Sequence, residues 1–283
     1  MEAFVARSGP ERLNILHLGD VVGRAGREAV KAHLPALKRE LAVDLAIVNA
    51  ENAAHGFGLN EKIAGELYEA GADVLSTGNH VWDQRDLIQY IERDPRLLRP
   101  ANFPKGTPGM GWRLHPLDGG RSVLVVNLMG RLFMEVLDDP FAALDAILAT
   151  HPLARGATAI IVDFHGEATS EKMAFGHFAD GRVSAVVGTH THVPTADAQI
   201  LPGGTAYISD CGMCGDYDSV IGMQKAPAVR RFVTRMPGEK ANPAEGEATV
   251  CGVFVAVDEA TGLARRIEPV RVGGRLTRHL PRP

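Results

Sequence analysis

Long apolar runs are missing from this 283-residue chain, and none approaches the roughly 18–20 residues of a membrane-spanning helix. Cysteine is scarce too: Cys211, Cys214 and Cys251 make an odd number, which argues against a disulfide framework. The first residues lack the apolar segment of a secretory signal. We therefore expect a cytoplasmic protein without a membrane segment. The pair Cys211 and Cys214 could bind zinc or act in redox chemistry, but no fourth zinc ligand is evident, so we interpret these cysteines as buried thiols.

An excess of basic charge is also missing. The chain has 30 Lys and Arg residues against 34 Asp and Glu, a net charge of −4, so we expect no stable complex with nucleic acid. Hydrophobic residues at 45% and charged residues at 23% are ordinary for a globular protein. A small phosphorylated substrate is still compatible with this charge, because bound metal ions would supply positive charge locally.

Strand-like apolar runs alternate with helical patterns over most of the chain. We expect strands at 13–18, 44–49, 73–76, 158–163 and 183–187, and helices at 26–41, 60–70, 84–92, 140–150 and 170–179. Further strands are expected at 112–117, 122–128, 197–201, 205–208, 249–257 and 264–272, with a mobile loop at 235–247. This pattern predicts an α/β sandwich in which central mixed sheets are flanked by helices. We expect a polar leader at 1–12, one domain at 13–274 and a tail at 275–283.

Polar side chains that can bind metals gather in five short clusters, each following a predicted buried strand. The candidates are Asp20, Glu51, Asn52, Asn79, His165, His190 and His192. In an open parallel sheet the loops after the strands meet at one edge, where ligands bind. We therefore expect these seven side chains to share one pocket, although they lie far apart in the sequence.

The number and type of these side chains suit a pair of metal ions. Two ions ~3.5–4 Å apart need a bridging carboxylate and about three further ligands each. His190 and His192 form the sharpest element, and Gly78 allows a close approach at Asn79. Taken singly, Asp20 could cap a helix, Asn79 could form a turn, and the others have equally ordinary explanations. Their joint placement at strand ends favours the metal site.

The same segments resemble those of the calcineurin-like dinuclear metallophosphoesterases, and within them the bacterial YmdB-like family. The resemblance covers about residues 13–272. It rests on Gly19-Asp20-Val-Val-Gly23-Arg24, Asn49-Ala-Glu-Asn52, Thr77-Gly-Asn-His80, Asp163-Phe-His165, Gly188-Thr-His-Thr-His-Val193 and Tyr217-Asp-Ser-Val-Ile-Gly222. Two positions differ from the wider superfamily: Val22 stands where a histidine is usual, and Glu51-Asn52 replaces a motif that ends in aspartate.

The resemblance implies a ligand set and an activity. One ion would be held by Asp20, Glu51, Asn52 and His192, and the other by Glu51, Asn79, His165 and His190, with Glu51 as the bridge. The family is described as iron-dependent phosphodiesterases that act on 2′,3′-cyclic nucleotides. Iron is the favoured metal, while the ligand types alone also suit manganese or zinc.

A mechanism follows from the expected charges. A hydroxide that bridges the ions would attack phosphorus, and His80 would give a proton to the leaving alkoxide, a step worth ~10²–10⁴-fold. Asp83 is a candidate to support the charge of His80. Arg24 and Lys172 are candidates to hold phosphate, although either could be an ordinary surface cation.

Three questions stay open at this stage. The same chemistry could act on another nucleotide or on RNA, and the metal site could instead be regulatory, with incidental turnover. A homo-oligomer is possible. The segment Tyr217-Asp218-Ser219 is typical of the family, but its sequence suggests no role.

Overall fold

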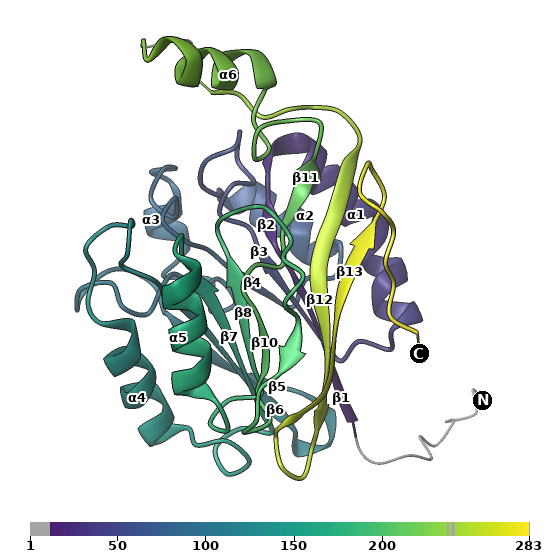
Figure 1. The fold of residues 1–283 in the computed structure, drawn as a ribbon. Helices are drawn as coiled ribbons and strands as arrows, with labels where there is room; N and C mark the ends of the chain where they lie inside the picture. Colours follow the sequence, from purple (N-terminus) through teal and green to yellow (C-terminus); the bar gives the residue numbers. More distant parts are fainter. Residues whose placement is uncertain (1–11, 237, 239–240, 283) are drawn as a thin grey trace.

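The computed structural model describes residues 12–236, 238 and 241–282, and it arranges them in four layers (Figure 1). Two β-sheets lie face to face at the centre, and helices cover the outer face of each sheet. This architecture confirms the predicted α/β sandwich. Within the described residues, no helix combines the length and apolar character needed to cross a membrane.

The first sheet has seven strands. Its order is β2 (Asp20–Val21), β11 (Met213–Asp216), β12 (Ala248–Asp258), β1 (Arg12–Leu18), β3 (Leu45–Asn49) and β4 (Val74–Ser76), while β13 (Ala264–Val272) pairs with β12. The strands β1, β3 and β4 run parallel, so their carboxyl ends lie at the same edge. Helices α1 (Gly23–Glu40) and α2 (Glu61–Glu69) cover the outer face. Leu34 and Leu37 of α1 are among the apolar residues buried there, as the helical spacing predicted.

The second sheet has six strands. Its order is β5 (Trp112–Pro116), β6 (Ser122–Met129), β7 (Ala159–His165), β8 (Ala185–Thr189), β10 (Ala206–Ile208) and β9 (Gln199–Ile200). The strands β6, β7, β8 and β10 are parallel, and β5 and β6 form the predicted hairpin. Helices α4 (Pro140–Thr150) and α5 (Thr169–Ala179) cover this sheet.

Apolar side chains of both sheets interlock to form the central core. Ile15 and Ile47 of the first sheet pack in one cluster with Ile161 and Val187 of the second. Strands that are buried on both faces read as continuous apolar runs, which is why these segments were recognisable in the sequence.

Several elements differ from the prediction. The helix expected at 84–92 is reduced to the single turn α3 (Leu87–Tyr90). The short strands β2 and β11 and the helix α6 (Lys225–Thr234) were not predicted from the sequence. The mobile loop predicted at 235–247 includes 237 and 239–240, which lie outside the described residues. The same holds for residues 1–11 of the predicted leader, whereas Arg12 already belongs to β1.

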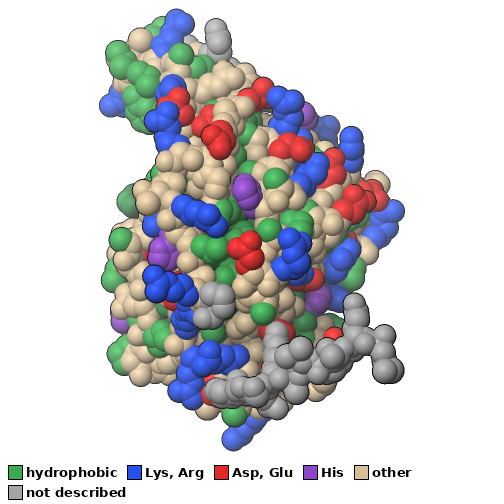
Figure 2. All heavy atoms as spheres, turned by 90° about the vertical axis from the view of Figure 1, so that its right-hand side faces the viewer, with side chains coloured by type: hydrophobic (Ala, Val, Ile, Leu, Met, Phe, Trp, Pro, Cys, Tyr) green, Lys and Arg blue, Asp and Glu red, His purple; other side chains and the backbone are tan. Residues whose placement is uncertain are grey.

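The surface agrees with the modest net charge. Figure 2 shows acidic and basic side chains interspersed over the face that carries α1 and β13. No basic stripe runs across this view. The three cysteines are buried and free, as we interpreted them from the sequence.

Candidate metal centre and active site

The seven predicted ligands meet at the carboxyl ends of the parallel strands. Asp20 follows β1, while Glu51 and Asn52 follow β3. The remaining four come from beyond β4, from the last position of β7 and from the loop after β8: Asn79, His165, His190 and His192. The structure thus brings together residues from both sheets across the core. Two groups could hold an ion, Glu51 with His165 and His190, and Glu51 with Asp20 and His192.

Glu51 is shared by both groups and lies at the centre of the site. One of its carboxylate oxygens, Oε1, lies 3.2 Å from Nε2 of His165 and 2.9 Å from Nδ2 of Asn52. The other, Oε2, accepts a hydrogen bond of 3.3 Å from the backbone N–H of His80. Glu51 is buried, and a carboxylate buried between two sets of ligand atoms has the geometry of a bridging ligand.

Asp20 carries a buried oxygen that is suited to bind a cation. Its Oδ1 is buried, and among the described residues no hydrogen-bond donor meets it. Nε2 of His192 lies 3.9 Å away. Burial raises the pKa of Asp20 to about 6, because it outweighs the opposing charges of His192 and His165. A buried carboxylate oxygen without a partner is costly unless a cation binds there, so the residues present fit a metal ion.

Each of the three histidines has a polar contact on the ring nitrogen that faces away from the site. Nδ1 of His165 lies 2.9 Å from Oγ1 of Thr189, and Nδ1 of His192 lies 2.8 Å from the carbonyl oxygen of Ile221. Nε2 of His190 lies 3.2 Å from Oε2 of Glu167. The nitrogens that face the site are therefore Nε2 of His165, Nε2 of His192 and Nδ1 of His190. Metal-binding histidines are held in this way in proteins.

The two asparagines stand among these nitrogens. Oδ1 of Asn79 lies 3.0 Å from Nε2 of His165, and the side-chain amide of Asn52 lies 3.2 Å from Nε2 of His192. A methyl group added at Gly78 would overlap the carboxylate of Glu51 and the ring of His165. The close approach of the chain at Asn79 therefore requires glycine at position 78.

The charges within the site are strongly coupled. Although burial acts to lower it, the pKa of His165 is raised to about 9, because the carboxylate of Glu51 favours the imidazolium. Burial and the charge of His165 lower the pKa of His190 to about 3. For Glu51 burial acts upward, but the neighbouring histidines hold its pKa below the ordinary range. Without a metal ion, a proton on His165 thus balances part of the negative charge.

The loop that carries His190 and His192 is held in a strained conformation. Both residues have positive φ angles, 98° and 66°, which are uncommon for residues other than glycine. Asp210 fixes the loop from below: its Oδ2 accepts hydrogen bonds from the N–H and the hydroxyl of Thr191, at 2.9 and 2.8 Å. Strain of this kind persists only where surrounding contacts impose it.

Lys172 completes this support. Its Nζ donates to the carbonyl of Thr189 at 2.7 Å and to Oδ2 of Asp210 at 2.9 Å, and the side chain is buried. The ammonium group is thus surrounded by protein acceptors below the loop. We therefore assign Lys172 to positioning the histidine loop rather than to holding phosphate.

His80 lies at the more exposed rim of the site. Its Nδ1 lies 2.9 Å from Oδ2 of Asp83, the residue that the sequence suggested as its support. The edge of its ring packs against Phe57, with centroids 5.0 Å apart. This pairing leaves Nε2 as the nitrogen that can carry a proton for transfer.

The comparisons with known proteins agree with this constellation. The YmdB-like protein family matches residues 16–270. The chain belongs to this family. A Bacillus subtilis 2′,3′-cyclic-nucleotide 2′-phosphodiesterase is 48% identical over 260 residues, which cover 92% of this chain and 97% of the relative.

Solved structures support the same assignment. A phosphatase from Mycoplasma pneumoniae has a TM-score of 0.86 and 36% identity, and the match covers 94% of this chain and 95% of that one. The calcineurin-like phosphoesterase YfkN from Bacillus subtilis shares the fold, with a TM-score of 0.56 at 11% identity, and the match covers 94% of this chain and 91% of that one. The family resemblance seen in the sequence is therefore confirmed.

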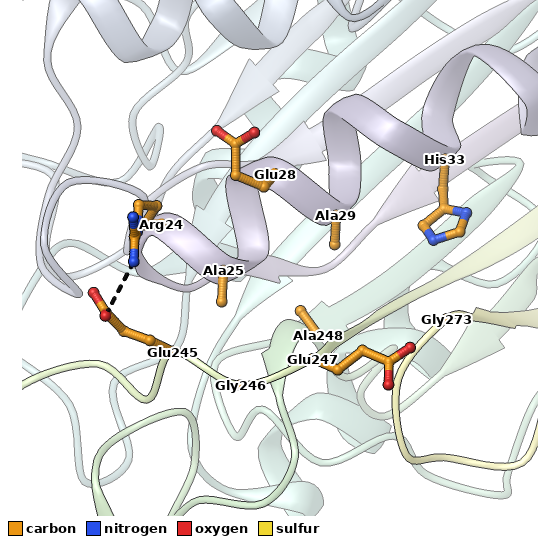
Figure 3. Close-up of a pocket in the computed structure, with 10 residues that line it drawn as sticks. All are labelled: Arg24, Ala25, Glu28, Ala29, His33, Glu245, Gly246, Glu247, Ala248 and Gly273. Carbon is orange, nitrogen blue, oxygen red and sulfur yellow. Dashed lines mark hydrogen bonds and ion pairs between the residues drawn. The ribbon is translucent and has the colours of Figure 1, made fainter.

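Arg24 lies apart from the seven candidate ligands. It is the second residue of α1, and its guanidinium pairs with Oε2 of Glu245 at 3.1 Å in an exposed ion pair (Figure 3). It lines a surface cavity that contains none of the seven predicted ligands. We therefore no longer assign Arg24 to holding phosphate.

Sequence reasoning assigned no role to several supporting residues of this family member. Asp163 accepts a hydrogen bond of 2.7 Å from Oγ1 of Thr189, the hydroxyl that orients His165. Tyr217 donates to the carbonyl of His192 at 3.2 Å. Asp210 comes just after β10, in the same way as the candidate ligands come after their strands. A search for polar residues that follow buried strands could therefore have found it.

Proposed function

We propose that this chain is a metal-dependent phosphodiesterase that hydrolyses small phosphodiesters, with 2′,3′-cyclic nucleotides as its substrate. The observation that carries this proposal is the shared carboxylate of Glu51 between two sets of ligand atoms. The identity and coverage of the Bacillus subtilis relative support the same chemistry. We propose two ions per chain, with iron favoured and manganese or zinc compatible with the donors.

The proposed ligands divide into two sets. Asp20, Glu51, Asn52 and His192 would hold one ion, and Glu51, Asn79, His165 and His190 would hold the other. When bound, the ions supply positive charge that stabilises the phosphoryl oxygens and activates the attacking water. The hydrogen bonds to Thr189 and Ile221 and the contact with Glu167 fix which nitrogen of each histidine faces the site.

The chain itself supplies the proton for the leaving group. When the ring is protonated, Asp83 accepts the Nδ1–H of His80, which leaves the Nε2–H for the ribose oxygen as its bond to phosphorus breaks. The backbone contact between His80 and Glu51 keeps this donor beside the ligands.

The experiment that tests the proposal combines elemental analysis with turnover of 2′,3′-cAMP and of bis-p-nitrophenyl phosphate, before and after chelation. About two ions per chain with chelator-sensitive hydrolysis is the expected result. Two ions without hydrolysis of either compound would instead support a regulatory metal-binding protein. Hydrolysis of the synthetic diester alone would point to another nucleotide or to RNA.

The remaining expectations from the sequence stay predictions. These are the cytoplasmic location, the division into leader, single domain and tail, and the homo-oligomer. For the last, helix α6 is the surface that favours association.

A further inference from the structure

Helix α6 stands away from the body of the molecule (Figure 1) and buries none of its residues. Its apolar side chains Val229, Phe232 and Val233 lie on one face, because positions i, i+3 and i+4 align on a helix, and the exposed Met236 follows just beyond its end. Phe232 is 74% exposed and Val233 is 77% exposed. Figure 2 shows apolar side chains gathered at this end of the molecule, flanked by basic ones.

A helix of this length needs a packing partner. Helices shorter than about 12–15 residues are marginal in water when nothing packs against them. No described residue of the same chain covers the apolar face of α6. The face is therefore expected to be covered by another molecule.

The charge of α6 limits the nature of that molecule. The helix contains Lys225, Arg230 and Arg231, Arg235 follows directly, and none of its ten residues is acidic. Within the described part of the chain, no ion pair engages Arg230, Arg231 or Arg235, whereas Lys225 pairs with Asp218. The face that receives α6 should thus combine an apolar floor with an acidic rim.

The chain carries such a face beside α1. A cavity of about 570 Å³ lies between α1 and the strand-entry segment 245–248 (Figure 3). Ala25, Ala29 and Ala248 line it, and Glu28, Glu245 and Glu247 contribute acidic groups. Arg24 and His33 line it too.

The cavity keeps an excess of acidic groups although two of its glutamates form ion pairs. Arg24 pairs with Glu245 at 3.1 Å, and Lys31 pairs with Glu28 at 3.0 Å. Exposed pairs of this kind are weak, so incoming arginines can exchange with the resident cations. Glu247 is engaged in no ion pair among the described residues, which leaves the three glutamates in excess over the two cations.

We propose that two copies of this chain exchange their α6 helices, each placing its apolar face over the α1 cavity of the other copy. Such a reciprocal contact has two-fold symmetry, so both helices and both cavities are used at once. Two exposed apolar faces and the surfaces they cover would bury on the order of 1,000 Å², which is sufficient for a specific interface. A second copy of the chain thus offers α6 both the apolar surface and the acidic groups that its side chains require.

The exchange of helices would also affect the position of a candidate metal ligand. Ile221 precedes α6 by four residues, and its carbonyl orients the ring of His192. The backbone of Gln224 at the start of the helix is tied to Asn242 at 2.9 Å. A partner that holds α6 therefore also holds the segment on which this ligand depends.

The first test measures the mass of the full chain by sedimentation velocity at micromolar concentration. Wild type is expected to be a dimer or a multiple of one, and the double variant Phe232→Asp/Val233→Asp a monomer with half the mass of the dimer. Val136→Asp, which changes another highly exposed apolar residue, serves as the control and should leave the mass unchanged. A monomeric wild type, or a dimer that persists in the double variant, would overturn the proposal.

The second test identifies the cavity as the receiving face. Arg230→Glu/Arg231→Glu and, separately, Glu245→Arg/Glu247→Arg should each give monomers. An equimolar mixture of these two variants should regain the dimer mass, because every helix then meets a cavity of opposite charge. No recovery on mixing would exclude this cavity. Pelleting of monomeric wild type with phosphatidylserine vesicles would assign α6 to a lipid surface instead. Neither measurement depends on phosphodiesterase activity.

Discussion

At the scale of single residues, the site combines ligands that can be recognised in the sequence with supports that cannot. Asp20, Glu51 and the histidines follow buried strands, so their convergence was predictable. Which nitrogen of each histidine faces the site depends on Thr189, Ile221 and Glu167. The contact at Ile221 is made by its backbone carbonyl, a group that every residue has. The type of residue at position 221 therefore could not have revealed it.

The first prediction concerns proton transfer by His80. His80→Ala should lower kcat for 2′,3′-cAMP by about 10²–10⁴-fold, because the leaving oxygen loses its donor. Asp83→Asn should lower kcat less, because it changes only the carboxylate that orients the ring of His80. Both variants should keep the wild-type metal content, measured by elemental analysis. Unchanged turnover in His80→Ala would remove this residue from the mechanism.

The second prediction concerns pH and the metal-free protein. The folded pKa of His165 is raised to about 9, so its stabilising contribution is complete below about pH 6.5 and is lost as the pH rises through 9. In the presence of chelator, the urea midpoint of wild type should therefore be lower at pH 9.5 than at pH 7. His165→Gln should show a smaller fall. An equal or higher wild-type midpoint at pH 9.5 would refute the assignment.

At the scale of elements, the loops beyond the strands set the geometry. The loop after β8 holds His190 and His192 at positive φ, and the buried pair of Lys172 and Asp210 supports it. From the sequence, Lys172 was a candidate to hold phosphate or an ordinary surface cation. Only the burial of its side chain and its contacts show that it supports the loop instead.

Removing one member of this pair is the third prediction. Lys172→Met leaves the carboxylate of Asp210 buried without its cation, which should cost about 3–5 kcal/mol of unfolding free energy. The loop then loses its support, so metal content should fall as well. Urea unfolding with chelator and elemental analysis report these two effects separately. Met173→Lys, at an exposed position next to Lys172, is the matched control and should change neither quantity.

The turn after β4 gives the fourth prediction. In Gly78→Ala the new methyl group would overlap Glu51 and His165, so we expect loss of metal binding and of turnover. Gly65→Ala, at a position with open space in α2, is the matched control and should preserve both. A Gly78→Ala protein with full metal content would show that the ligands are not as close as described.

Other elements escaped the sequence for simple physical reasons. The strands β2 and β11 have two and four residues, too few to show a periodic pattern. Helix α6 buries nothing, so its apolar face has no counterpart in the core of the same chain, and Pro227 in its first turn resembles a loop signal. By contrast, β7 and β8 are mostly apolar strands that are buried along their whole length, and they were found directly.

At the scale of the whole molecule, the packing of two sheets explains how one site draws ligands from distant parts of the chain. The central core joins the sheets, so the carboxyl ends of β3 and β4 lie beside those of β7 and β8. Asn49 at the end of β3 reaches Asp163 in β7, with 3.1 Å between its Nδ2 and Oδ2 of the aspartate. The packing of the two sheets thus fixes the positions of the candidate ligands from one sheet relative to those from the other.

The carboxylate of Glu51 is shared by both groups of candidate ligands. The decisive measurement is therefore the metal content of Glu51→Ala beside wild type, with hydrolysis of 2′,3′-cAMP followed in the same preparations. We predict about two ions per chain and turnover in wild type, and at most one ion without turnover in the variant. Two ions and undiminished turnover in Glu51→Ala would contradict the shared site and the function derived from it.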